Sequence, residues 1–413
     1  MKPMSPDDVR HELILRREIA LIDLRDEAQF ALGHPLFAAQ IPLDRLAMEA
    51  PHRIPRPSTR VVLYGENDGH DLVTAGAEIL RGLGYGNVTS LDGGLKGWSS
   101  AGFELFQDVN SYSKAFGELV EHRRGTPSLS AEEVQGLIDT GEPMVIMDAR
   151  RFDEYATMAI PGGISVPGAE LVLRAKALAP DPNTRIIVNC AGRTRSLIGT
   201  QSLINAGIAN RVDALRNGTI GWTLAGQTLA HQQSAAFPAG QPDALSEAQV
   251  AAQDVAYRAG VRRVDGAMLA GLAEDVERTL YRFDVRTSNE YRVGHLPNFL
   301  HAPGGQLVQE IDAFAPVRGA RIVLADDLGV RAAMTASWLA QMGWEVYVLD
   351  GEFQHATEAG TGPILPPRGP AGRYKRPYEG TDNPAAAMQA YLDWEYGLVA
   401  QLERDATHGF FVI

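Results

Sequence analysis

The chain of 413 residues contains a single cysteine, Cys190, and this scarcity sets the first limits on its chemistry. One cysteine excludes an intrachain disulfide and leaves no second thiol in the chain to resolve a bond formed at the first. Basic residues are also in deficit, because 38 Lys and Arg stand against 51 Asp and Glu, which gives a net charge of −13. This acidity disfavours general binding of nucleic acid or of an anionic membrane surface.

Long apolar runs and metal-binding patterns are missing as well. No apolar run reaches the ~18 residues that a membrane span needs, and residues 1–8 lack the basic start and apolar core of a secretion signal. We therefore expect a cytoplasmic protein. With one cysteine and scattered histidines, the chain has no zinc-type spacing, and it has no Gly-rich nucleotide motif. We expect no metal and no cofactor.

One pattern occurs three times along the chain. An apolar strand that ends in Asp-x-Arg occupies residues 21–25, 146–150 and 282–286. A second apolar strand recurs at the same offsets of 125 and 136 residues, ending at Gly65, Cys190 and Asp326. A third anchor recurs at residues 91–98, 215–222 and 349–353. Solenoid repeats are only about 20–50 residues long, so this period indicates tandem domains.

The repeated pattern resembles the rhodanese-homology domain, and the whole chain resembles multidomain bacterial thiosulfate sulfurtransferases. The resemblance is most specific around Cys190, with Arg195 five residues later, the Asp148-x-Arg150 pair upstream and Gly-Trp222 downstream. It implies an α/β fold of three tandem modules, each a mostly parallel sheet flanked by helices. We expect the catalytic module at 126–230, modules without the active cysteine at 1–105 and 262–355, and a Pro/Gly-rich segment with a C-terminal helix at 356–413.

Local patterns predict individual elements within this frame. Ser130 followed by Glu133 is a capping box and marks a helix start. Gly207 and Gly343 are expected to end the helices that follow the second strands. The predicted strands are 144–148, 185–189, 211–215 and 322–325, and the predicted helices are 197–206, 332–342, one from Leu245 within the bridge 231–262, and 384–403. The linker 106–127 joins the first two modules, and the Pro/Gly-rich residues 360–370 are expected to be irregular.

Residues 185–196 predict a reactive thiol. An apolar strand delivers Cys190 to a short loop that contains Gly192, Arg193 and Arg195 and continues into a helix. Such a turn aims main-chain N–H groups and the positive end of a helix inward, which holds an anion and favours a thiolate. A lone cysteine elsewhere would more simply be an inert buried thiol, but this position favours a nucleophile.

The resemblance implies double displacement on a small anionic sulfur donor, thiosulfate. Arg193 or Arg195 would hold the sulfonate end, Cys190 would take the outer sulfur as a persulfide, and loop N–H groups would stabilise it. Cyanide or a thiol would then accept the sulfur. The predicted site comprises Cys190 as catalytic residue, Arg195, Arg193, Ala191, Gly192, Thr194 and Ser196 as substrate-binding residues, and Asp148 and Arg150 as supporting residues.

Several alternatives stay open. Arg193 could face solvent, and the Asp148–Arg150 pair could be an ordinary ion pair, since it also occurs in the copies without cysteine. The outer modules could be scaffold, or Arg331 could gather an anion or partner.

A phosphatase needs Cys-x5-Arg, one residue more than this loop offers. A 3-mercaptopyruvate donor is disfavoured by two loop arginines. A redox-sensing or partner-binding platform without turnover is the alternative function. The oligomeric state is open.

Overall fold

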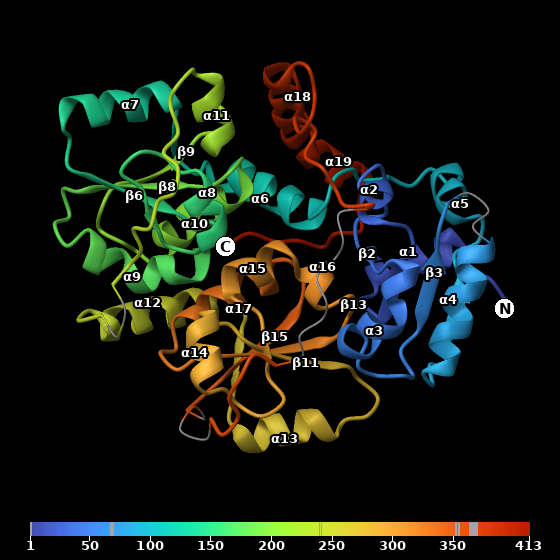
Figure 1. The fold of residues 1–413 in the computed structure, drawn as a ribbon. Coiled ribbons are helices and arrows are strands. Elements are labelled where there is room, and N and C mark those ends of the chain that lie inside the picture. Colours follow the sequence, from blue (N-terminus) through green and yellow to red (C-terminus); the bar gives the residue numbers. More distant parts are fainter. Residues whose placement is uncertain are drawn as a thin grey trace.

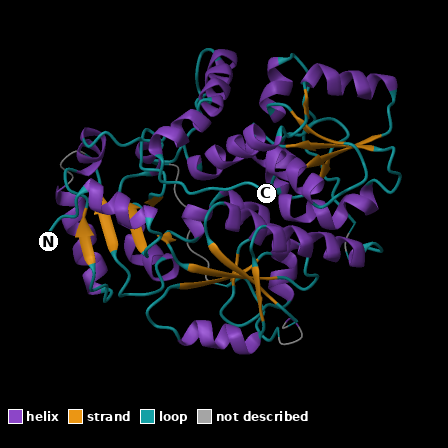
Figure 2. Cartoon of the chain, turned by 180° about the vertical axis from the view of Figure 1, so that it is seen from behind, coloured by secondary structure: helices purple, strands orange, loops and turns teal. Residues whose placement is uncertain are grey.

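The structure, a computed structural model, describes residues 2–66, 70–238, 240, 242–351, 353, 356–362 and 371–413, with only the backbone of residue 70. Within these residues lie three five-stranded sheets, each flanked by helices, and a helical tail (Figure 1; Figure 2 shows the opposite face). The predicted α/β fold of three modules is therefore confirmed. No helix of the described part is long and apolar enough to cross a membrane.

The middle module has a purely parallel sheet in the order β5-β9-β8-β6-β7. Two of its strands occur at the predicted residues, while the helix after the cysteine loop begins three residues before its predicted start. Gly207 ends this helix at a φ of +71°, a conformation that glycine adopts without steric cost. Its elements are β5 (Ser128–Leu129), α7 (Ala131–Thr140), β6 (Met144–Asp148), α8 (Phe152–Thr157), β7 (Ile164–Ser165), η1 (Gly168–Glu170), α9 (Leu171–Leu178), β8 (Arg185–Asn189), α10 (Thr194–Asn205), β9 (Val212–Leu215) and α11 (Gly218–Leu224).

The first module contributes four parallel strands to a sheet in the order β13-β1-β3-β4, with β2 paired to β1. Its fifth strand, β13 (Val317–Arg318), belongs to the sequence of the third module and pairs antiparallel with β1, opposite Ile19 and Ala20. The first module's own elements are α1 (Pro6–Ile14), β1 (Ile19–Asp23), α2 (Glu27–Phe30), β2 (Ala39–Gln40), α3 (Leu43–Arg53), β3 (Val61–Tyr64), α4 (His70–Gly82), β4 (Val88–Ser90) and α5 (Gly94–Ser100).

The third module repeats the parallel arrangement of the middle one, in the order β10-β15-β14-β11-β12. Its predicted strand and helix each begin one residue earlier than expected. Its elements are β10 (Arg262–Val264), α13 (Gly266–Glu274), β11 (Leu280–Asp284), α14 (Ser288–Val293), β12 (Leu300–His301), α15 (Gly304–Gln309), α16 (Ile311–Phe314), β14 (Arg321–Ala325), α17 (Arg331–Gln341) and β15 (Glu345–Leu349).

Helices also connect and follow the modules. The linker between the first two modules contains α6 (Ser111–Arg124), and the bridge to the third contains α12 (Leu245–Arg258), which begins where it was predicted. The C-terminal helix divides at Gly397 into α18 (Pro384–Tyr396) and α19 (Leu398–Asp405). Of the segment expected to be irregular, residues 363–370 lie outside the described part.

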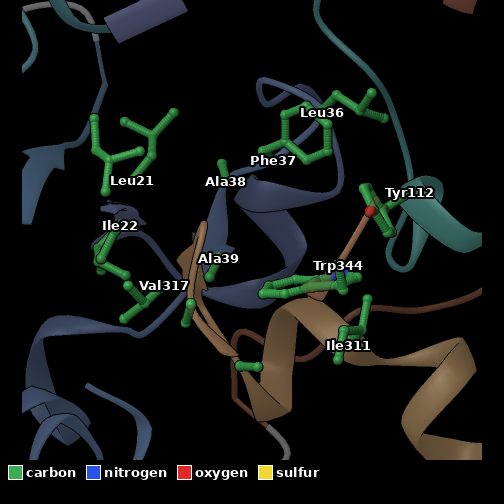
Figure 3. Close-up of a cluster of buried hydrophobic side chains, with 14 of the residues drawn as sticks. Leu21, Ile22, Leu36, Phe37, Ala38, Ala39, Tyr112, Ile311, Val317 and Trp344 are labelled. Atoms are coloured by element: carbon green, nitrogen blue, oxygen red, sulfur yellow. The ribbon is translucent and has the colours of Figure 1, made fainter. Parts of the chain in front are cut away.

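The first and third modules share one hydrophobic core. Figure 3 shows Phe37 and Ala39 of the first module on one side, Ile311 and Trp344 of the third on the other, and Tyr112 of the linker helix beside them. All five residues are at most 8% exposed. This shared core and β13 join the two outer modules. The helix α6 and the C-terminal tail lie between the outer modules and the middle module (Figure 1).

Candidate active site

The predicted nucleophile lies at the carboxyl end of β8, where the chain turns into α10. Cys190 is 2% exposed. Its Sγ donates to Ser196 Oγ at 3.5 Å, and Ser196 Oγ in turn donates to the carbonyl of Arg193 at 2.8 Å. The hydroxyl hydrogen of Ser196 is therefore committed to the loop backbone, so the same oxygen presents its lone pairs to the thiol.

The start of α11 fixes the cysteine loop from the other side. The N–H groups of Thr219 and Ile220 donate to the carbonyls of Cys190 and Ala191, both at 3.0 Å. Gly218 makes this approach possible, since it has a φ of +54° and a Cβ at this position would lie 2.3 Å from the Cys190 oxygen. The segment between β9 and Trp222 is thus hydrogen-bonded to the cysteine loop and fixes its position.

Arg195 forms a two-pronged ion pair inside the middle module. Its Nη1 and Nη2 donate to Glu154 Oε2 and Oε1 at 2.7 and 3.0 Å. Burial alone would raise the pKa of Glu154, but Arg195 outweighs burial and lowers that pKa to about 2. The Arg195 side chain is 14% exposed and lines the same cavity as Cys190, so its guanidinium can present its remaining donors to an anion.

Arg193 has a different environment from the one expected at sequence level. Its Nε and Nη2 donate to Glu118 at 2.7 and 2.9 Å, and Nη2 also pairs with Glu121. Its Nη1 donates to Asn217 and to the hydroxyl of Tyr396, and the guanidinium lies 4.0 Å from the centre of the Tyr396 ring. The side chain is 2% exposed, so it does not face solvent, and these contacts join the loop to α6 and α18.

The Asp148–Arg150 pair supports the strand ends beneath the loop. Arg150 donates to both carboxylate oxygens of Asp148 and to the carbonyl of Met158. The same geometry recurs in the modules without cysteine, where Arg25 bonds Asp23 and Gly33, and Arg286 bonds Asp284 and Gly294. This recurrence indicates a structural ion pair of the module itself.

A further contact of this pair in the middle module involves the residue before the cysteine. Asn189 Nδ2 donates to Asp148 Oδ2 at 3.0 Å. Because Asn189 directly precedes the cysteine, this bond ties the position of the nucleophile to the buried ion pair. The corresponding residues are Tyr64 in the first module and Ala325 in the third.

Cys190 opens into a cavity of about 110 Å³. Pockets for drug-sized ligands measure roughly 300–1,000 Å³, so this one suits a small ion or small molecule. Sequence reasoning did not find the residues that close it, which come from α6, α15 and the tail: Ser113, Lys114, Gln309, Tyr374, Arg376, Tyr378, Tyr391 and Glu395. In Figure 1, α18 and α19 stand between α11 and the first module.

Two further cations line the cavity beside Arg195. Lys114 Nζ lies 2.9 Å from Asp108 Oδ1 and over the rings of Tyr391 and Trp394. Arg376 donates to the hydroxyl of Tyr378 at 3.1 Å, and its side chain is 41% exposed. With Arg193, four cationic side chains from three separate segments therefore line the cavity of Cys190, although the chain as a whole is acidic.

Glu395 is a buried acid in the same cavity. The residue is 1% exposed, its Oε1 accepts from the hydroxyl of Tyr391 at 3.1 Å, and its Oε2 has no hydrogen-bond partner in the described part of the chain. Burial raises the pKa of this carboxyl to about 7, against the opposing influence of Lys114. Both of its protonation states are accordingly populated near neutral pH.

The corresponding loops of the outer modules lack the reacting atom. Asp326 stands at the nucleophile position of the third module, and its carboxylate accepts from the N–H groups of Gly329, Val330 and Arg331. Arg331 is fully buried. It pairs with four carboxylates, Glu170, Glu290, Asp326 and Asp327. In the first module the position is Gly65, while residues 67–69 and the side chain of His70 lie outside the described part.

Comparison with known proteins agrees with this architecture. The family model of the rhodanese-like domain matches residues 5–101, 130–225 and 268–359. The chain belongs to the rhodanese-like family. These three ranges lie close to the predicted modules, whose limits stay predictions.

Two relatives indicate the chemistry of this rhodanese-like chain. The crystal structure of a thiosulfate sulfurtransferase from Pseudomonas aeruginosa is 48% identical, covers 100% of both chains and superposes with a TM-score of 0.96. The proposed sulfur carrier protein YrkF of Bacillus subtilis is 26% identical over 159 residues, which are 34% of this chain and 84% of that protein. The full-length match supports sulfurtransferase activity.

Proposed function

We propose that the protein transfers a sulfane sulfur from thiosulfate, through a persulfide on Cys190, to cyanide or a thiol. The observation that carries this proposal is the position of the chain's only cysteine, at the end of a parallel strand and in a small cavity with Arg195, Lys114 and Arg376. Three cations around one nucleophile suit a doubly charged donor. We expect the reaction in the cytoplasm, where acceptor thiols stay reduced.

In the first half-reaction, the sulfonate oxygens of thiosulfate bind Arg195, with Arg376 and Lys114 on the other walls of the cavity. The Cys190 thiolate attacks the outer sulfur. The sulfur–sulfur bond of the donor breaks, its electron pair leaves with sulfite, and a new bond joins the outer sulfur to Sγ. We assign no substrate contact to Arg193, because Glu118, Glu121 and Tyr396 occupy its donors.

The persulfide formed in this way needs stabilisation of its terminal sulfur. Ala191, Gly192, Thr194 and Ser196 contribute main-chain N–H groups at the start of α10, where the helix dipole favours negative charge. The main-chain N–H groups of residues 191–196 have no hydrogen-bond acceptor among the described residues, in contrast to the third module, where the Asp326 carboxylate accepts from the equivalent groups. Asp148 and Arg150 hold the strand ends below.

The deciding experiment measures thiosulfate:cyanide activity together with intact mass after thiosulfate alone. We expect the native chain to gain one sulfur atom and to form thiocyanate, and Cys190→Ser to do neither. Asp326→Ser, at the equivalent position of the third module, is the matched control and keeps both. A folded native chain that gains no sulfur and does not turn over would favour the alternative of a redox-sensing or partner-binding platform.

A further inference from the structure

The tail brings an acid to the active loop. Glu395 on α18 lines the cavity of Cys190, and a Cβ placed on Gly192 would lie 3.3 Å from Glu395 Oε2. The carboxyl group is therefore adjacent to the loop two residues beyond the nucleophile. Tyr391 takes up the other oxygen, Oε1, from the preceding turn of the same helix.

The free oxygen of this group has no structural explanation. Glu395 is only 1% exposed, and its Oε2 has no hydrogen-bond partner among the described residues. Buried polar atoms are nearly always hydrogen-bonded in native proteins. A carboxylate oxygen that is unsatisfied and lies at the wall of a reaction cavity is available to a substrate proton.

The groups around Glu395 leave its charge adjustable. From α6, Lys114 favours the ionised form and Glu118 opposes it, while Arg193 of the loop favours it. Tyr374, Arg376 and Tyr378 of the tail line the same cavity, and α11 contains no ionisable side chain. On α19, Arg404 pairs with Glu104 of the first module, and the Asp405 carboxylate accepts from Thr407.

We propose that Glu395 accepts the proton of an incoming thiol in the second half-reaction, so that the acceptor attacks the Cys190 persulfide as a thiolate. This role rests on the proposed sulfur transfer at Cys190. A free thiol has a pKa of about 8.5 and is mostly protonated at neutral pH, and only the thiolate is a good nucleophile. Proton transfer is most effective when the pKa of the base lies near the working pH, and burial raises that of Glu395 to about 7.

The step balances without an oxidant or reductant. The acceptor S–H bond breaks, its proton moves to Glu395 Oε2, and its electron pair forms a bond to the terminal sulfur of the persulfide. The bond between that sulfur and Cys190 Sγ breaks, and its electron pair returns to Sγ as a thiolate. The acceptor leaves as a persulfide and takes the proton back from Glu395. In the first half-reaction the neutral carboxyl avoids repulsion of the thiosulfate dianion.

A single-turnover experiment tests this role. The native chain, Glu395→Gln, Glu395→Asp and the exposed control Glu403→Gln are loaded with thiosulfate, freed of excess donor and mixed with 2-mercaptoethanol from about pH 6 to about pH 10. Loss of the persulfide is followed by intact mass. We expect Glu395→Gln to slow discharge about 100-fold near pH 7, Glu395→Asp to restore part of the rate, and Glu403→Gln to match the native chain.

The pH profile separates proton transfer from a structural effect. Above the pKa of the thiol the solution supplies thiolate, so discharge of Glu395→Gln and of the native chain is expected to converge. Loading by thiosulfate is expected to change less than about threefold below about pH 7, where the native carboxyl is also neutral. Equal discharge at every pH, or one constant reduction at every pH, overturns the role of Glu395. Failure of the native chain to load overturns the sulfur transfer itself.

Discussion

Asp326 Oδ2 accepts a hydrogen bond of 3.0 Å from the main-chain N–H of Arg331, and these two residues occupy the positions of Cys190 and Arg195 in the third module. The same carboxylate also accepts from Gly329 and Val330. The third module therefore fills its own anion cradle with a side chain. In this module the loop is a structural element and has no nucleophile.

This relationship predicts a structural role for Asp326. In Asp326→Ala three main-chain N–H groups lose their acceptor, so the free energy of unfolding is expected to fall by about 1–3 kcal/mol. Thiocyanate formation at Cys190 is expected to stay at the native level. Denaturant unfolding and steady-state assays check the two parts, and a loss of turnover in the folded variant would show that the third module takes part in the chemistry.

Arg195 is expected to act on donor binding. Loss of a charge-assisted contact costs about 1.5–3 kcal/mol, so Arg195→Ala should lower kcat/KM for thiosulfate by about 10- to 100-fold. Arg195→Lys keeps the positive charge but lacks the planar guanidinium, so its kcat/KM should lie between those of Arg195→Ala and the native chain. Steady-state kinetics with varied thiosulfate measure the effect. Arg151, an exposed neighbour of Glu154, provides the control Arg151→Gln, whose kcat/KM should equal that of the native chain.

Arg193 is expected to act on stability instead. Arg193→Ala leaves the buried carboxylate of Glu118 without its partner, which should lower the free energy of unfolding by about 3–5 kcal/mol. The double variant Arg193→Met with Glu118→Leu removes both charges and should recover most of that loss. Denaturant unfolding measures both. A large rise in KM for thiosulfate in well-folded Arg193→Met/Glu118→Leu would instead indicate that Arg193 contacts the donor.

Gly218 is expected to control the shape of the cysteine loop. In Gly218→Ala the new Cβ would lie 2.3 Å from the Cys190 carbonyl, at a φ of +54°, so the loop must move and persulfide formation should slow at least tenfold. Gly226→Ala is the matched control, because its φ is +74° but nothing lies within 4 Å of the new Cβ. It should lose about 1 kcal/mol of stability and load with sulfur at the native rate.

The ion pair of Glu154 predicts a loss of stability in acid. Burial opposes ionisation of Glu154, but Arg195 lowers its folded pKa to about 2, whereas the unfolded carboxyl titrates near 4.3. A lowered folded pKa stabilises the fold above the unfolded value, so up to about 3 kcal/mol should vanish as the pH falls from about 4.3 to about 2. Unfolding measured against pH should show a shallower loss in Glu154→Gln than in the native chain or Glu403→Gln.

The sequence alone predicts the modules and the nucleophile because both depend on local patterns. The strands at 144–148 and 185–189 are apolar runs whose counterparts recur in the other two modules, and the Ser130–Glu133 capping box forms as expected. Cys190 stands out through its place in the repeat. These features need only neighbouring residues, and neighbouring residues are what a single sequence shows.

The cavity-lining residues that lie outside the cysteine loop could not be predicted from local sequence patterns. Lys114, Arg376 and Glu395 lie far from Cys190 along the chain and meet it only after three modules pack together. Arg193 was expected at the substrate or in solvent. Its carboxylate partners were not predicted, because they lie on the helix α6, in a segment that the sequence indicated only as a linker. The cluster of tyrosines and basic residues at 373–378 was the available signal, although nothing in the sequence indicates which module it covers.

The strand β13 limits the ways in which the chain can be cut into fragments that fold. It closes the open edge of β1 from the far end of the sequence, and an uncovered edge strand invites pairing with other chains. A fragment that ends before residue 317 would expose that edge, and one that begins after β1 would leave β13 without its partner. Of the three repeated units, the two that lack a cysteine therefore complete each other's structure, and deletion of either one is expected to expose a surface prone to aggregation.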